Sequence, residues 1–111
     1  MNGEHDTMID PTIAAALKDK HGPDLHVLSH DGVEIVVKRP GKAEYRRFRH
    51  MTLDERRKED AAETFVRDCT VLPDAKALAA EFEVRPGLID TFAGKLIELA
   101  GTAKECEAVP L

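Results

Sequence analysis

The chain has 111 residues, of which 42% are hydrophobic and 33% are charged, the proportions of an ordinary globular domain. Sixteen Lys and Arg against 21 Asp and Glu leave a net charge of −5, which excludes a chain that is basic throughout, as a simple polybasic nucleic-acid binder would be. Only 5% of the residues are aromatic and Trp is absent, so neither a base-stacking platform nor an aromatic sugar cleft is expected. The length predicts one domain.

Cysteine content and hydropathy indicate the cellular compartment. Cys69 and Cys106 are too few for a small disulfide-stapled scaffold, so both are expected to be free thiols in a reducing environment. The acidic N-terminus has no apolar core of the kind found in a signal peptide. No apolar run approaches the ~20 residues that span a bilayer, so no membrane segment is expected and a cytoplasmic protein is predicted.

The first elements in chain order are a helix and a hairpin. Residues 1–9 are polar and are expected to be flexible. Asp10 followed by Pro11 is typical of a helix N-terminus, with an N-cap and a proline at the first helical position. This helix is expected to end at His21-Gly22-Pro23.

The hairpin is the clearest local pattern. Strands at 25–30 and 33–38 flank Asp31-Gly32, a dipeptide that suits a type I′ turn because both residues tolerate positive φ. Alternation along the second strand predicts one apolar face, and the first strand is expected to match it through Leu25 and Val27. The apolar face of the second strand consists of Val33, Ile35 and Val37.

A helical period of 3.6 residues follows the break at 39–41. Thr52 and Glu55 predict a capping box for a second helix in this part, and Asp74 predicts the N-cap of a third. Gly101 fits the C′ position that closes the last helix. The residues expected to face the core from these helices are Tyr45, Phe48, Met51, Ala62, Phe65, Val66, Cys69, Leu78, Ala79, Phe82, Leu88, Ile89, Phe92, Leu96, Ile97 and Ala100.

These elements predict an α+β fold that is mostly α-helical, with one small β-hairpin near the N-terminus. Residues 10–101 are expected to form a single globular domain, and residues 102–111 a flexible tail.

Patterns that carry enzyme chemistry are absent from the sequence. His26 and His30 share a strand face, but four residues of strand separate them by roughly 13 Å, too far for two ligands of one zinc ion. The sequence has no Gly-x-Ser-x-Gly motif and no phosphate-binding glycine-rich loop. Cys69 lies on an apolar helix face and is expected in the core, since a reactive thiol needs an electropositive, exposed site. We therefore expect no catalytic residue, no metal and no cofactor.

Charge is distributed unevenly along the chain. The segment 38–58 has nine basic and three acidic residues, a net charge of +6. The other residues then include 7 basic and 18 acidic ones, a net charge of −11. This asymmetry indicates either a recognition surface for an acidic partner or arginines that pair with the protein's own acids. The candidate partner-binding residues are Arg39, Lys42, Arg46, Arg49, Arg56 and Arg57.

The order of motifs from Ile13 to Gly101 resembles the small tail assembly chaperones of long-tailed phages and related prophages. The matching segments are Arg39-Pro40, Ala43-Glu44-Tyr45-Arg46-Arg47-Phe48, Val66-Arg67-Asp68-Cys69-Thr70-Val71-Leu72-Pro73-Asp74, Arg85-Pro86-Gly87-Leu88 and Leu99-Ala100-Gly101.

This resemblance implies a non-enzymatic protein that binds the tape measure protein, a long helical chain, before the tail tube polymerises around it. It implies the tail tube protein and self-association as further contacts, the host cell cytoplasm as location, and absence from the mature virion. Two alternatives remain open. One is a nucleic-acid-associated accessory protein that uses segment 38–58, although the acidic balance makes nucleic acid an unexpected partner. The other is a structural subunit that stays in the assembled tail.

Overall fold

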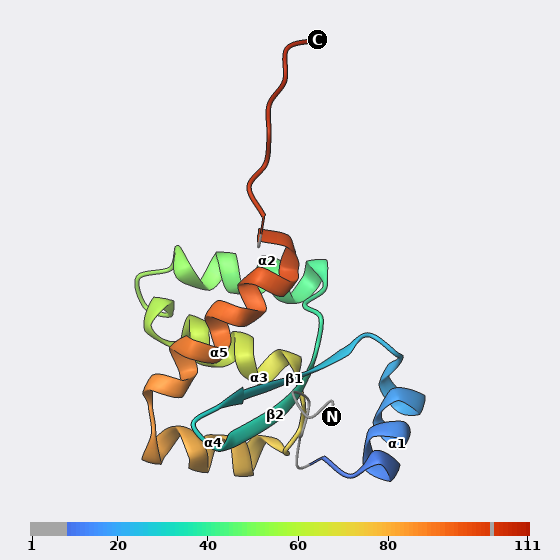
Figure 1. Cartoon of the computed structure of the whole chain (residues 1–111). Coiled ribbons are helices and arrows are strands. Elements are labelled where there is room, and N and C mark those ends of the chain that lie inside the picture. The colour runs from blue at the N-terminus through green and yellow to red at the C-terminus, as the bar shows by residue number, and fades with distance from the viewer. Residues whose placement is uncertain (1–8, 103) are drawn as a thin grey trace.

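The structure is a computed structural model that describes residues 9–102 and 104–111. The expected flexible segment 1–9 therefore lies, apart from Ile9, outside the described residues. The elements in chain order are α1 (Pro11–His21), β1 (Leu25–His30), β2 (Val33–Lys38), α2 (Lys42–Thr52), the 3₁₀ turn η2 (Lys58–Asp60), α3 (Ala61–Cys69), β3 (Thr70–Leu72), α4 (Ala75–Val84), α5 (Gly87–Ile97) and the terminal π-helical turn η3 (Glu98–Thr102). The α+β class, mostly helical, is confirmed (Figure 1).

The predicted hairpin forms with the expected turn. Strands β1 and β2 are antiparallel, and their paired residues run from Leu25 opposite Lys38 to His30 opposite Val33. Asp31 and Gly32 have φ values of 52° and 82°, the two positive values that a type I′ turn requires. The turn dipeptide therefore sets the register of the two strands.

The sheet has three strands rather than the one hairpin expected. Strand β3 pairs antiparallel with β2, Val36 lying opposite Leu72 and Val37 opposite Thr70, with an irregularity between the two β2 residues. The strand order is β1-β2-β3. Only three residues separate the end of α3 from Pro73, so this strand is too short to show an alternating pattern by which the sequence could predict it.

The alternation on β1 is one residue out of phase with the prediction. Leu28 lies opposite Ile35 and is buried with it in the core, whereas Val27 is 38% exposed. Leu25 and Val27 lie opposite Lys38 and Val36, on the other face of the sheet. A one-residue shift moves every side chain of a strand to the opposite face, so the prediction for this strand was wrong.

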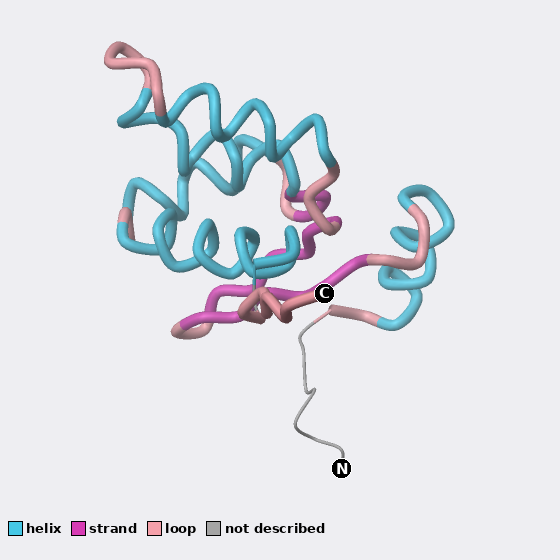
Figure 2. Tube along the Cα trace, turned by 90° about the horizontal axis from the view of Figure 1, so that it is seen from above, coloured by secondary structure: helices cyan, strands magenta, loops and turns pink. Residues whose placement is uncertain are grey.

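The core lies between one face of the sheet and the helices that follow it. Helix α3 packs against both α2 and α5, and α5 also contacts β1. Helix α1 buries no residue completely and is set apart from the other helices at one end of the sheet (Figures 1 and 2). The buried cluster consists of Leu28, Ile35, Val37, Phe65, Val66, Cys69, Leu78, Phe82, Leu88, Phe92, Ala93 and Leu96.

Two of the three expected N-caps are present. The Asp10 carboxylate accepts a hydrogen bond from the Thr12 backbone N–H at 2.6 Å, and the Asp74 carboxylate accepts one from the Ala77 N–H at 2.8 Å. The capping box expected at Thr52 is wrong, because Thr52 belongs to the last turn of α2 and its hydroxyl donates to the Arg49 carbonyl. The next helix, α3, begins only at Ala61, after the η2 turn.

Candidate interaction surface

Helix α2 has a basic side and an apolar side. Lys42, Arg46 and Arg49 are spaced four and three residues apart, so they form one stripe, and all three are exposed. Tyr45 and Phe48 lie on the apolar side and pack against the core.

Aromatic contacts hold the apolar side of α2 in place. The Phe48 ring stacks on Phe65 of α3 with centroids 4.5 Å apart, and Tyr45 meets the edge of Phe65 at 6.3 Å. Such pairs add about 0.5–1.5 kcal/mol each beyond the burial of their surface. Phe65 is 1% exposed, so this cluster fixes the rotation of α2 and keeps the basic stripe turned outward.

Four of the nine basic residues in segment 38–58 pair within the protein. Lys38 donates to Glu44 at 3.0 Å, Arg47 lies 3.6 Å from Asp68 and Lys58 lies 3.1 Å from Glu55. The fourth is Arg39, described below. The five others make no side-chain hydrogen bond or ion pair with any described residue, and they are Lys42, Arg46, Arg49, Arg56 and Arg57.

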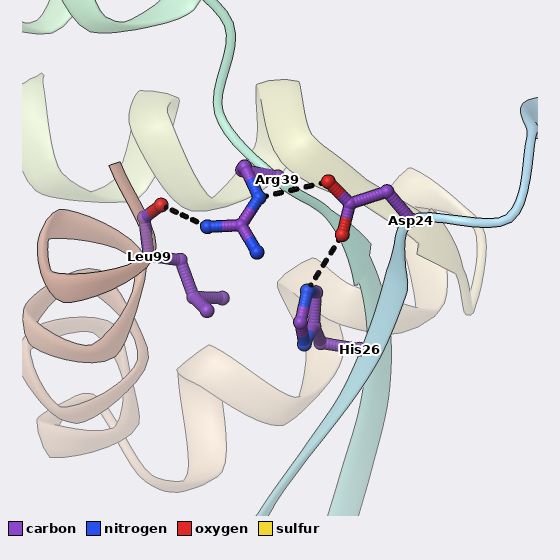
Figure 3. A network of polar contacts seen from close by, with 4 residues as sticks. All are labelled: Asp24, His26, Arg39 and Leu99. Carbon is purple, nitrogen blue, oxygen red and sulfur yellow. Dashed lines mark hydrogen bonds and ion pairs between the residues drawn. The ribbon is translucent and has the colours of Figure 1, made fainter. Parts of the chain in front are cut away.

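Arg39 has an internal role that separates it from the rest of the predicted set. Its Nε donates to the Asp24 carboxylate at 2.8 Å, and its Nη1 donates to the Leu99 carbonyl at 2.7 Å (Figure 3). Asp24 also hydrogen-bonds the His26 ring at 2.9 Å. The hydrogen bond from Arg39, followed by that from His26, holds the pKa of Asp24 below its usual value. Arg39 thus ties the segment after α5 to the start of β1.

Arg57 lies apart from the α2 stripe, in a polar cleft between α2, η2 and α3. The cleft has a volume of about 350 Å³, and two further arginines, Arg47 and Arg67, line it with Asp60, Glu63, Thr64 and Met51. Sequence reasoning missed Arg67, because only the packing of α3 against α2 brings it beside Arg47 and Arg57. The predicted residues therefore lie in four different places. These are the α2 stripe (Lys42, Arg46 and Arg49), the turn between α2 and η2 (Arg56), the polar cleft (Arg57) and the internal contacts of Arg39.

Glu44 anchors the base of α2. Its carboxylate accepts hydrogen bonds from Lys38 at 3.0 Å and from the Gly41 backbone N–H at 2.8 Å. The hydrogen bond from Lys38 is the main reason that the pKa of Glu44 is lowered from its usual value, although partial burial opposes the shift. This capping interaction joins the end of β2 to the first turn of α2.

The Cys69 thiol, the possible metal ligands and the helix lengths bear on other kinds of function. Cys69 is confirmed as a core residue with 0% exposure, and burial raises the pKa of its thiol to about 12. Among residues 9–102 and 104–111, no group of three or more His, Cys, Asp or Glu side chains is arranged to hold a metal ion. None of the described helices is both long and apolar enough to cross a membrane.

Comparison with known proteins identifies the family of the chain. One solved structure, that of the uncharacterised protein rbstp2171 from Bacillus stearothermophilus, matches with a TM-score of 0.70 and 23% sequence identity. The match covers 86% of this chain and 99% of that one, and at this identity it shows a shared fold. No curated protein matches the chain. Residues 17–108 match the family described as a domain of unknown function, DUF6848. Because this match spans most of the chain, the protein belongs to the DUF6848 family.

Proposed function

We propose that the protein is a non-enzymatic tail assembly chaperone that binds the tape measure protein and keeps it soluble while the tail tube assembles. The observation that carries the proposal is the set of five exposed basic side chains without an ionic partner among the described residues: Lys42, Arg46, Arg49, Arg56 and Arg57. Since no described acidic side chain pairs with them, these side chains can form ion pairs with an acidic partner.

The placement of these charges suits recognition of a long helix. Lys42, Arg46 and Arg49 form a straight stripe along about two turns of α2, a length that matches two turns of an acidic partner helix. Complementary charge of this kind increases the association rate and fixes orientation more than it increases affinity. The net charge of −11 on the residues outside segment 38–58 would repel an acidic partner from other faces.

Co-expression with the long helical product of the neighbouring gene tests this proposal. We expect the protein to retain the long chain in a pulldown and to keep it in the soluble fraction. Arg46→Glu together with Arg49→Glu should abolish retention at moderate salt. The matched control reverses two exposed lysines on other helices, Lys20→Glu with Lys76→Glu, and should retain the partner. Equal retention by the two double variants would overturn the role of the stripe.

The same unpaired arginines support a second candidate, an accessory protein that contacts nucleic acid. Binding to nucleic acid falls steeply as salt increases, because each neutralised phosphate releases counterions. Titration of a duplex across a salt series therefore distinguishes the two candidates. The slope of the logarithm of the binding constant against the logarithm of salt concentration gives the number of ions released. A slope that corresponds to several ions, together with no retention of the long helical chain, would favour nucleic acid. Detection of the protein in purified virions would instead favour a structural tail subunit.

A further inference from the structure

An apolar groove lies along the outer edge of the sheet, and none of its lining residues belongs to segment 38–58. Four consecutive residues of β1, from His26 to Ser29, form one wall of the groove, and the helical segment after Gly87 forms the other. The groove has a volume of about 380 Å³. Its helical wall consists of Thr91, Phe92, Lys95 and Leu99.

The β1 wall of the groove is an open sheet edge. Strand β1 pairs with β2 on one side only, so within the described part of the chain its outer backbone groups have no strand partner. Natural edge strands are usually protected by charged residues or proline. The sequence Leu-His-Val-Leu-Ser-His from Leu25 to His30 contains no Lys, Arg, Asp, Glu or Pro. An edge strand beside a helix is the arrangement in which an extended peptide adds to a sheet, with its backbone on the strand and its side chains in the groove.

The C-terminal segment of the chain has the properties of such a peptide. Residues 104–111 form no helix or strand and leave the body as an extended segment (Figure 1). Val109 is 78% exposed and Leu111 is fully exposed. In an extended chain these two side chains point to the same side, and Pro110 between them needs no ladder partner for its nitrogen. Eight extended residues span about 26 Å, enough to cover the six residues of β1.

The charges of the segment and the groove are also complementary. Glu105 and Glu107 precede the apolar end of the segment, and Lys95 lies in the groove wall. Lys95 is 54% exposed and lies 3.0 Å from Glu98 on the surface, an exposed pair that a second carboxylate can join.

The direction of the chain favours a second copy as the donor of the segment. Arg39 holds Leu99 beside Asp24, at the start of β1, and Arg85 donates to the Asp31 carbonyl at 2.8 Å, at the end of β1. Helix α5 therefore runs antiparallel to β1, and the chain's own tail would have to reverse and then pair parallel to β1. A second copy can add its tail antiparallel, which is the slightly more stable pairing.

We propose that residues 104–111 of one copy add as a strand to β1 of a second copy and place Val109 and Leu111 in the groove between β1 and α5. When the exchange is reciprocal, with the tail of each copy in the groove of the other, it closes as a two-fold dimer. The proposal concerns self-association alone and does not depend on the tape measure partner.

Two full-length variants test the exchange from both sides. Val109→Asp with Leu111→Asp damages the tail and leaves the groove intact. Thr91→Arg fills the groove and leaves the tail intact, and Ala80→Arg on the exposed side of α4 is its matched control. We expect sedimentation velocity to show a dimer for the wild type and for Ala80→Arg. Each of the other two variants should have a dimer dissociation constant at least tenfold higher than that of the wild type. Its thermal unfolding midpoint should equal that of the wild type at a concentration low enough for both proteins to be monomeric.

The decisive experiment mixes the tail variant (Val109→Asp with Leu111→Asp) with the groove variant (Thr91→Arg). The Thr91→Arg copy still has an intact tail, and the tail variant still has an intact groove. The mixture should therefore form a heterodimer in which this one contact is restored. Its dissociation constant should fall between those of the wild type and of either variant alone. A monomeric wild type, or a mixture no more associated than its components, would overturn the proposal.

Discussion

Substitution of Phe65 by leucine tests the packing that orients the basic helix. Phe65 is 1% exposed and contacts two aromatic rings of α2, stacking on Phe48 at 4.5 Å and meeting Tyr45 at 6.3 Å. Losing the two aromatic pairs costs about 0.5–1.5 kcal/mol each, and the change in core shape costs up to about 1.5 kcal/mol more. The expected loss in the free energy of unfolding is therefore about 1–4.5 kcal/mol.

Urea-induced unfolding followed by circular dichroism measures this loss. Val84→Ala is the matched control, since Val84 is 75% exposed and its truncation should change the free energy of unfolding by no more than about 0.5 kcal/mol. Phe48→Leu, alone and combined with Phe65→Leu, completes a double-mutant cycle whose coupling energy should be about 0.5–1.5 kcal/mol. A loss for Phe65→Leu as small as that of the control would refute the claim that this cluster fixes α2.

Three further predictions concern the reactivity of the two thiols, the N-cap of α4 and the dependence of the free energy of unfolding on pH in acid. A thiol reagent at neutral pH should label Cys106 and leave Cys69 unmodified until the protein unfolds, because Cys69 is buried and its pKa is raised to about 12; labelling of two thiols in the native state would contradict its place in the core. Asp74→Ala should lower the free energy of unfolding by about 1 kcal/mol through loss of the α4 N-cap, whereas Asp74→Asn should change it little. The folded-state pKa of Glu44 is lowered from 4.5, so its contribution to stability is present above that value and is lost as pH falls through the lower folded-state pKa. The unfolding free energy of the wild type should thus fall more steeply below about pH 4.5 than that of Glu44→Gln, and identical slopes would count against the Lys38 contact.

Local sequence signals predicted most of the elements correctly. The Asp31-Gly32 turn, the caps at Asp10 and Asp74 and the helix-ending Gly101, with φ of 117°, each depend on residues within a few positions of one another. The apolar spacing of Phe65, Val66 and Cys69 likewise predicted a buried helix face. Such features are encoded where they occur, so a single sequence is enough to find them.

Features that depend on distant partners were the ones missed or misassigned. Strand β3 forms because its backbone pairs with β2, and nothing in Thr70–Leu72 alone distinguishes this segment from a break between helices. The phase of β1 was wrong because both Val27 and Leu28 are apolar, and the choice between them depends on which face the helices after β2 cover. Burial of Val36, at 3% exposed, shows that the second face of the sheet is apolar too.

The sequence predicted most of the basic residues that belong to the candidate site, but it did not predict how they are arranged in space. The sequence indicated a basic segment, yet Arg39 was grouped with the rest because its partners Asp24 and Leu99 lie 15 and 60 residues away. Conversely, Arg67 joins Arg57 at the polar cleft only through helix packing. The groove beside β1 had no sequence signal, since it is formed by the separation between a strand edge and a helix more than 60 residues later.

The most direct test of the proposed function is the affinity of the purified protein for the tape measure chain, measured at several salt concentrations. The account predicts that Arg46→Glu with Arg49→Glu weakens binding at least tenfold at low salt, and that the difference from wild type shrinks as salt screens the charges. The control with Lys20→Glu and Lys76→Glu should bind within about twofold of wild type. Equal affinity of the stripe variant and the wild type at low salt, or no binding by either, would contradict it.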